Sequence, residues 1–249
     1  MVKNRYRIIF VMMLLIAWEV VVKLKLFSVI AMPSLITIGQ AFFSDISDII
    51  MAIFNSFLVI GEGFIISAVL ALILVVMSRH PILNDLIEFM ITIFHPLPGV
   101  ALLPLILLWV GAGRGTILVI VVHAILWPLL INVKQEVERI HQEYGQLIHV
   151  FMIPRAQRWF KIYMPGSLPG IISGSKIGWS RGWRGFISAE MIFSIVGKSN
   201  GIGWLISEKR YSSDTPGLFA GILAIILCSL IIEKYVFNTI ENKTIKRWA

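Results

Sequence analysis

Charged residues are scarce in this chain. Of its 249 residues, 14% are Asp, Glu, Lys or Arg, whereas 57% are hydrophobic and the mean hydropathy is +0.85. Water-soluble globular chains carry about a quarter charged residues, so the composition excludes that class and leaves an integral membrane protein. A spanning helix needs roughly 20 apolar residues, so the length leaves room for about five to eight spans.

Cysteine is almost missing, and acidic residues are outnumbered. Cys228 is the one cysteine, which excludes disulfide bonds within the chain, and its apolar surroundings make it a small hydrophobe. Fourteen acidic residues face 22 basic ones, for a formal charge of +8. On a soluble domain this excess can indicate nucleic-acid binding. In a chain of this hydropathy we expect it to follow membrane topology, with no nucleic-acid partner.

Six apolar segments predict six membrane-spanning helices. The first follows three basic residues and resembles a signal peptide, but a small-residue cleavage site is missing, so we expect a retained helix. Internal repeats, low-complexity tracts and flexible linkers are lacking, which predicts one all-α polytopic membrane domain over residues 1–249. The predicted spans are 8–22, 57–77, 89–110, 116–133, 168–190 and 217–233.

Lysine and arginine are unevenly distributed between the predicted loops. With the N-terminus inside, thirteen of them fall on the inner side and six on the outer side, and three more lie within the fifth span. Short cytoplasmic loops accumulate Lys and Arg. The count therefore predicts that both termini are cytoplasmic.

The stretch between the fourth and fifth spans, 134–167, is too polar to cross a bilayer and is long for a loop. Leu147, Val150, Phe151 and Phe160 recur in it at helical spacing and can form one apolar face. Such a face suits docking into the groove of a cytoplasmic partner. It suits an interfacial helix on lipid equally well, and composition leaves both alternatives open.

The same stretch resembles the coupling loop of ABC-importer permeases, which reads Glu-Ala-Ala, three residues, Gly, nine residues, Ile, one residue and Leu-Pro. When the proline of this motif is placed on Pro165, Ile162 falls on its isoleucine. Gln146 then stands for Glu and Met152 for Gly. Because glycine tolerates backbone angles that a side chain penalises, we expect a different turn at Met152, with the bend set by Pro154.

Further short motifs extend the resemblance along nearly the whole chain. Their order is similar to that of the nitrate, sulfonate, taurine and bicarbonate group of importer permeases, and together they are more specific than any one of them. The motifs are Ala17-Trp18-Glu19, Met32-Pro33-Ser34, Pro96-Leu97-Pro98, Leu103-Pro104, Trp109-Val110-Gly111, Leu168-Pro169-Gly170, Ala189-Glu190-Met191 and Gly201-Ile202-Gly203-Trp204-Leu205-Ile206.

The resemblance implies a permease of the type I ABC-importer class in a bacterial inner membrane, with no ATPase site and no bound cofactor of its own. It implies a second permease copy, two cytoplasmic ATPase subunits that use ATP and magnesium, and an external binding protein that delivers a small anionic solute. Membrane lipid is the remaining expected contact. The predicted ATPase-coupling residues are Gln146, Leu147, Met152, Pro154, Arg155, Arg158, Phe160, Ile162 and Pro165.

Ionisable side chains interrupt the fifth span, where they are costly and are expected to face a cavity or a partner. Arg181 and Arg184 lie on nearly the same face of an ideal helix and repel each other. Either an acid such as Glu190 or Glu62 neutralises them in an ion-pair network, or an anion passes between their bidentate forks. The predicted pathway residues are Lys176, Arg181, Arg184, Glu190, Pro96 and Pro98.

Glycine, proline and histidine residues give the remaining predictions for the spans. Glycines recur every fourth residue from Gly170 to Gly182, and this stripe predicts close helix packing. Pro96 and Pro98 break the third span, either to line a pathway or as a packing kink. His95 and His123 are expected to be hydrogen-bonded structural residues rather than proton carriers.

Two other function classes compete with the importer subunit. A membrane-embedded enzyme needs a nucleophile, an acid or a metal constellation, and only scattered charged residues are present. A secondary transporter driven by an ion gradient is the stronger alternative, with Glu62 and Glu190 as coupling carboxylates.

Overall fold

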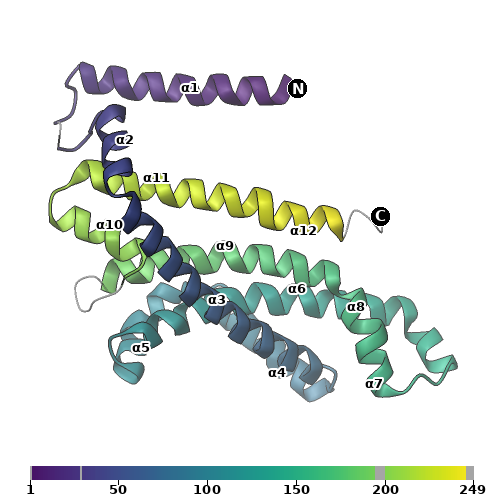
Figure 1. The fold of residues 1–249 in the computed structure, drawn as a ribbon. Helices are drawn as coiled ribbons and strands as arrows, with labels where there is room; N and C mark the ends of the chain where they lie inside the picture. Colours follow the sequence, from purple (N-terminus) through teal and green to yellow (C-terminus); the bar gives the residue numbers. More distant parts are fainter. Residues whose placement is uncertain (1, 29, 194–199, 245–249) are drawn as a thin grey trace.

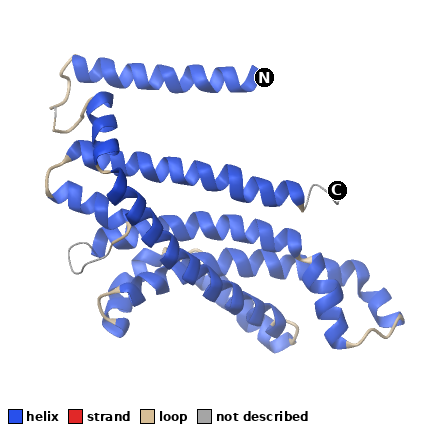
Figure 2. Cartoon of the chain, in the orientation of Figure 1, coloured by secondary structure: helices blue, strands red, loops and turns tan. Residues whose placement is uncertain are grey.

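The computed structural model describes residues 2–28, 30–193 and 200–244, and within these ranges helices are joined by short turns without any strand (Figure 2). The predicted all-α class is confirmed. Figure 1 shows the start of α1 (Val2–Lys23), the C-terminal helix and α7 (Arg155–Arg158) at one end of the molecule, and α10 (Ile202–Tyr211) at the other. Both ends of the described chain thus lie at one end of the molecule, while its cytoplasmic orientation stays a prediction. Lys198, Lys246 and Arg247 of the charge count lie outside the described residues.

Three long helices form the centre of the fold. α6 packs along both α3 and α9, and its contact with α9 is the most extensive in the described chain. Ile60, Ile120 and Phe186 belong to one buried apolar cluster between these helices, and Leu130 and Val137 belong to a second. The three helices are α3 (Ile46–Met77), α6 (Arg114–Val150) and α9 (Leu168–Phe193).

The glycine stripe of α9 faces α6, which confirms its predicted packing role. A Cβ atom on Gly170 would lie 2.5 Å from the backbone oxygen of Asn132, and one on Gly174 would lie 2.9 Å from the Cα of Leu129. Both distances are much shorter than the optimal separation of nonbonded carbon atoms, which is about 3.5–4.0 Å. The two helix backbones can therefore come this near only because the stripe lacks side chains.

The third predicted span is not one continuous helix. α4 (Pro81–Phe94) stops before Pro96 and Pro98, a 3-10 turn covers Gly99–Leu102, and α5 (Leu103–Val110) continues at 90° to α4. Proline lacks the N–H that a helix needs, and although His95 before Pro96 still has helical angles, the hydrogen-bond ladder cannot continue through Pro96. Two prolines at alternate positions therefore end α4 and turn the chain.

α6 continues far beyond the apolar run 116–133. Its 37 residues make it about 55 Å long at 1.5 Å per residue, against roughly 30 Å for the hydrocarbon core of a bilayer. Val137, Ile140 and Ile148 are buried, so the first half of the segment predicted as a loop is an amphipathic helix. The rest of that segment forms α7 (Arg155–Arg158), the π-helical turn η2 (Trp159–Tyr163) and α8 (Met164–Gly166).

Among the described residues, three helical stretches are long and apolar enough to cross a membrane, or four if α4 and α5 form one bent span. α1 and α9 have the length but carry more charge, so six spans stay a prediction. The third stretch is the continuous C-terminal run Thr215–Lys243. This run consists of α11 (Thr215–Ile231), the π-helical turn η3 (Ile232–Phe237) and α12 (Asn238–Lys243). The remaining helices are α1 (Val2–Lys23), α2 (Leu35–Ser44) and α10 (Ile202–Tyr211).

Lys209 joins several helix ends at the end of the molecule opposite α7. Its ammonium contacts the carboxylate of Asp45, which precedes α3, and lies 3.0 Å from Oδ2 of Asp214, which precedes α11. Asp214 also accepts a hydrogen bond of 3.0 Å from the backbone N–H of Gly217. The start of α3, the end of α10 and the start of α11 are thereby held together.

Candidate functional site

A cavity of about 400 Å³ lies where the α4–α5 break meets α6 and α9. His95, Pro96 and Pro98 come from the break, His123 from α6, and the two arginines of the fifth predicted span from α9. His123 is nine residues beyond Arg114, or about 14 Å along the helix, which is half the thickness of a hydrocarbon core. The cavity therefore sits near mid-depth of the apolar region.

Arg181 reaches across this cavity to the break. Its Nη1 lies 3.0 Å from Nε2 of His95. A guanidinium donates and does not accept, so Nε2 of His95 accepts and the imidazole is neutral with its proton on Nδ1. The partner of Arg181 therefore positions the guanidinium without cancelling its charge.

Arg184 lines the same cavity and is exposed, whereas Lys176 lies elsewhere. The Lys176 ammonium is 2.9 Å from Glu233 on η3 and 3.9 Å from Glu241 on α12. The basic residues predicted to interrupt the fifth span are thus divided between a cavity and an ion-paired contact with the C-terminal helix. The role of Lys176 in a pathway stays a prediction.

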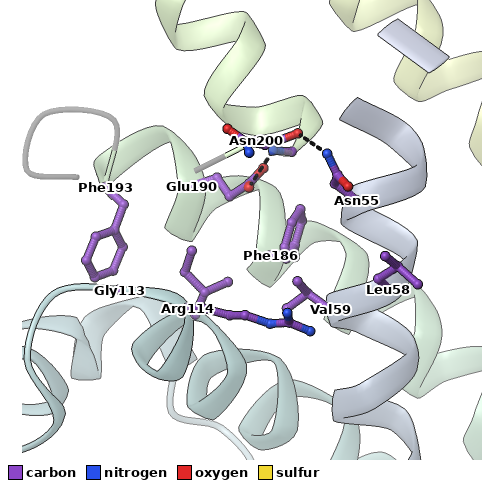
Figure 3. A pocket seen from close by; sticks show the side chains of 11 residues that line it. Asn55, Leu58, Val59, Gly113, Arg114, Phe186, Glu190, Phe193 and Asn200 are labelled. Carbon is purple, nitrogen blue, oxygen red and sulfur yellow. Dashed lines mark hydrogen bonds between the residues drawn. The ribbon is translucent and has the colours of Figure 1, made fainter. Parts of the chain in front are cut away.

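Glu190 lies in a second cavity of about 240 Å³ near the far end of α9, shown in Figure 3. Its side chain is buried, and its carboxylate accepts hydrogen bonds from the backbone N–H groups of Gly201 at 3.1 Å and Gly203 at 2.9 Å. These N–H groups begin α10, so Glu190 caps that helix from another element, where a negative charge is stabilised by the helix dipole. Its role in a pathway also stays a prediction.

Arg114 lines the cavity of Figure 3 but extends toward α3 rather than toward Glu190. Its Nη2 lies 2.6 Å from Oε2 of Glu62, and both side chains are largely exposed. Glu62, which was considered as a neutralising acid for the arginines of α9, is therefore paired with a different arginine.

The helix α6 ends in a turn that Met152 makes in the left-handed region, with φ of 48°. The N–H of Met152 donates to the oxygen of His149, and the N–H of Ile153 donates to that of Ile148. This pair of bonds is the Schellman motif, in which glycine is the usual left-handed residue. Met152 thus adopts backbone angles that usually favour glycine, and the expected difference between this turn and that of the family stays a prediction.

Large apolar side chains are exposed around this turn. Met152 is 83% exposed, and Val150, Phe151 and Phe160 on η2 are each exposed by more than two thirds. The charged residue Arg155 is exposed as well. Ile162 and Arg158 are half-buried instead, and Arg158 donates to the backbone oxygen of Ile153. The predicted coupling residues thus form a folded arm with an uncovered apolar tip. Of the others in that set, Gln146, Leu147, Pro154 and Pro165 are exposed.

Comparison with known proteins assigns this arrangement to a family. Residues 63–236, more than half of the chain, match the family described as binding-protein-dependent transport system inner membrane component. The chain belongs to this family. The match includes the cavity at the α4–α5 break, the glycine stripe and the arm around Met152.

Curated relatives in this family share about a quarter of aligned residues with the chain. The taurine transport system permease protein TauC of Escherichia coli (strain K12) is 26% identical over 64% of this chain and 56% of TauC. The putative aliphatic sulfonates transport permease protein SsuC of Bacillus subtilis (strain 168) is 23% identical over 92% of this chain and 82% of SsuC. The nitrate import permease protein NrtB of Synechocystis sp. (strain ATCC 27184 / PCC 6803 / Kazusa) is 23% identical over 74% of this chain and 66% of NrtB. The chain therefore spans little more than half of TauC and about two thirds of NrtB.

Sequence reasoning passed over two residues of the cavity in this family member, His95 and His123. Both were expected to be structural because a lone histidine in an apolar run has no visible partner in the sequence. The available signal was the position of His95 directly before Pro96, at a predicted helix break that has to be covered by protein or to line a cavity.

Proposed function

We propose that this chain is the permease subunit of an ATP-driven importer that moves a small oxyanion through the membrane by alternating access. The observation that carries the proposal is the cavity near mid-depth, which contains Arg181 and Arg184 and has no acidic side chain among the described residues that line it. Uncompensated cations in an apolar region are costly unless an anion visits them, and arginine forks match oxyanion geometry.

The names of the relatives agree with this substrate class. They refer to taurine, aliphatic sulfonates and nitrate, and a further relative is the bicarbonate transport system permease protein CmpB of Synechococcus elongatus; each of these solutes carries a sulfonate, nitrate or carbonate oxyanion. The alternative of a structural ion-pair network loses support, because the acids considered for it, Glu62 and Glu190, have other partners in Arg114 and in the start of α10.

The proposed partners of such an importer lie at the two ends of the chain. Two ATPase subunits, which supply the ATP and magnesium chemistry, dock on the apolar tip around Phe151 and Phe160. Their end of the molecule also holds both ends of the described chain, so we propose that the termini are cytoplasmic. An external binding protein delivers substrate at the opposite end, and a second permease copy completes the pathway in the inner membrane.

Uptake into proteoliposomes tests the pathway. The chain, reconstituted with its ATPase subunit and binding protein, should take up one of labelled taurine, nitrate or bicarbonate only when ATP is present. Arg184→Ala should reduce uptake at least tenfold and leave ATPase association intact, and Arg184→Lys should recover part of it because the charge remains but the fork is lost. Arg139→Ala, which removes an exposed arginine paired with Glu136 and Glu143 on α6, is the matched control and should transport normally.

Co-purification tests the docking surface. Phe151→Asp with Phe160→Asp places two charges on the apolar tip and should abolish capture of the ATPase subunit. Tyr211→Asp changes an exposed aromatic residue at the other end of the molecule and should leave capture unchanged. Accumulation of substrate by the chain alone, driven by an ion gradient, would show a secondary transporter instead and contradict the proposal.

A further inference from the structure

Three residues of the described chain hold buried ring nitrogens without a hydrogen-bond partner: His123 with both nitrogens, and Trp127 and Trp183 with Nε1. A buried polar group left unpaired costs about 1–3 kcal/mol, so each one needs an explanation. His123 and Trp127 are four residues apart on α6, and both line the cavity with the two arginines, whereas Trp183 does not line it. Two of the three unpaired groups therefore meet in the candidate site.

The segment on either side of the α4–α5 break covers these nitrogens. The ring of Phe94, the last residue of α4, stacks on Trp127 with centroids 5.5 Å apart. The carbonyl of Phe94 is near the His123 ring but does not complete a hydrogen bond. On the other side of the break, a Cβ on Gly99 would lie only 3.2 Å from Nδ1 of His123. The cover thus consists of the two ends of the break, and glycine lets it close tightly.

This cover has the features of a hinge. Pro96 and Pro98 donate no backbone hydrogen bond, and the helices that flank them turn by 90°. Helix kinks at proline interrupt the hydrogen-bond ladder, and domain motions are absorbed at a few such element-terminal residues. His95, bonded to Arg181, ties this hinge to the charged side chain opposite it.

We infer that the break His95–Gly99 is a gate, and that its movement uncovers His123 and Trp127 as neutral hydrogen-bond groups for the oxyanion held by Arg181 and Arg184. The inference rests on the proposed function and adds to it the residues that contact the substrate in a second state. Uncharged N–H donors suit this task, because a site on a transport pathway must bind an ion strongly enough to admit it and weakly enough to release it. The cost of the unpaired groups in the covered state is then offset in the open state.

Substitutions of the unpaired groups separate this role from a structural one. Replacing a buried, unpaired polar group by an apolar one of similar shape is nearly neutral or stabilising. His123→Leu, which is close in size, should therefore leave the unfolding temperature equal or higher. Both His123→Leu and Trp127→Phe should reduce uptake of taurine, nitrate or bicarbonate at least tenfold in the reconstituted complex. His123→Gln retains an N–H donor and should recover part of the uptake. Trp183→Phe, which removes the unpaired donor outside the cavity, is the control and should transport normally.

Thiol labelling tests the movement of the gate. In a Cys228→Ser background, which removes the one native cysteine, His123→Cys should react with a small water-soluble thiosulfonate at least tenfold faster in one state of the ATPase cycle than in the other. Equal labelling in the states with and without trapped ATP, or His123→Leu and Trp127→Phe uptake within twofold of the wild type, would overturn the gate. If the wild-type complex transports none of the three probes, the proposed function itself fails, and the two failures are therefore distinct.

Discussion

Substitution of a single glycine of the α9 stripe should force α6 and α9 apart. On Gly170, the methyl group of alanine would lie 2.5 Å from the backbone oxygen of Asn132 and 2.6 Å from Cγ of Glu136. The shortfall from an ordinary contact of 3.4 Å is about 0.9 Å at the oxygen. A backbone atom cannot rotate away as a side chain does, so the helices themselves must shift.

The cost can be isolated with a matched glycine on another helix. Gly61→Ala on α3 meets nothing within 4 Å, and both substitutions gain the same helix propensity of about 1 kcal/mol. The difference between the two variants is therefore the cost of overpacking, about 1–3 kcal/mol. For a chain of this size each kcal/mol shifts the midpoint by about 2–4 °C, so Gly170→Ala should unfold at least about 2 °C below Gly61→Ala.

Thermal unfolding in detergent, followed by circular dichroism at a fixed scan rate, measures this difference. Equal midpoints for the two alanine variants would refute the close approach of α6 and α9 at Gly170. A fall in both midpoints relative to the wild type would instead show that any methyl group on these helices is harmful, and the glycine stripe would have no special place.

Two further changes have directions that the structure fixes. Met152→Gly should raise the unfolding midpoint, because it removes a left-handed strain of about 1–2 kcal/mol at φ of 48°; an unchanged or lower midpoint in the same thermal assay would contradict this. Unfolding measured against pH should show a plateau bounded by the Lys209 cluster. Burial raises the pKa of Asp214, but hydrogen bonds from Gly217 and Lys209 outweigh it and hold the pKa below 3.8, so stability is present above about that pH and lost as pH falls through the lowered pKa. The hydrogen bond with Asp45 raises the pKa of Lys209 above 10.5 despite its burial. The stability that Lys209 contributes is therefore full below pH 10.5 and is lost as pH rises through the raised pKa. Asp214→Asn should remove the loss of stability at acid pH, and an unchanged loss would count against the cluster.

Local patterns in the sequence predict those features that depend on neighbours along one helix. The glycines from Gly170 to Gly182 predict the face of α9 that packs on α6, since a period of four residues keeps one side of a helix. The prolines at 96 and 98 predict the break, since the effect of a proline acts on its own turn. Arg181 and Arg184 are likewise found from their cost within an apolar span.

Features that depend on a distant element are not predicted. The sequence does not indicate that Glu190 caps α10 or that Lys176 pairs with η3. From the sequence alone, each of these charged side chains could equally well line a cavity. The polar stretch after Lys134 reads as a loop by its charge content, although Val137, Ile140 and Ile148 share the buried side of a continuing helix. His123 acquires its importance only when the break folds over it, which no period along α6 reveals.

The unusual length of α6 has a mechanical consequence. Pro128 lies inside the helix, between the cavity and the arm, and the 22 residues from there to Val150 span about 33 Å. A bend of about five degrees at Pro128 displaces the far end by about 3 Å over that length. The outer part of α6 thus acts as a lever. A small change of angle beside the cavity is coupled through it to a displacement of several ångströms at the folded arm around Met152.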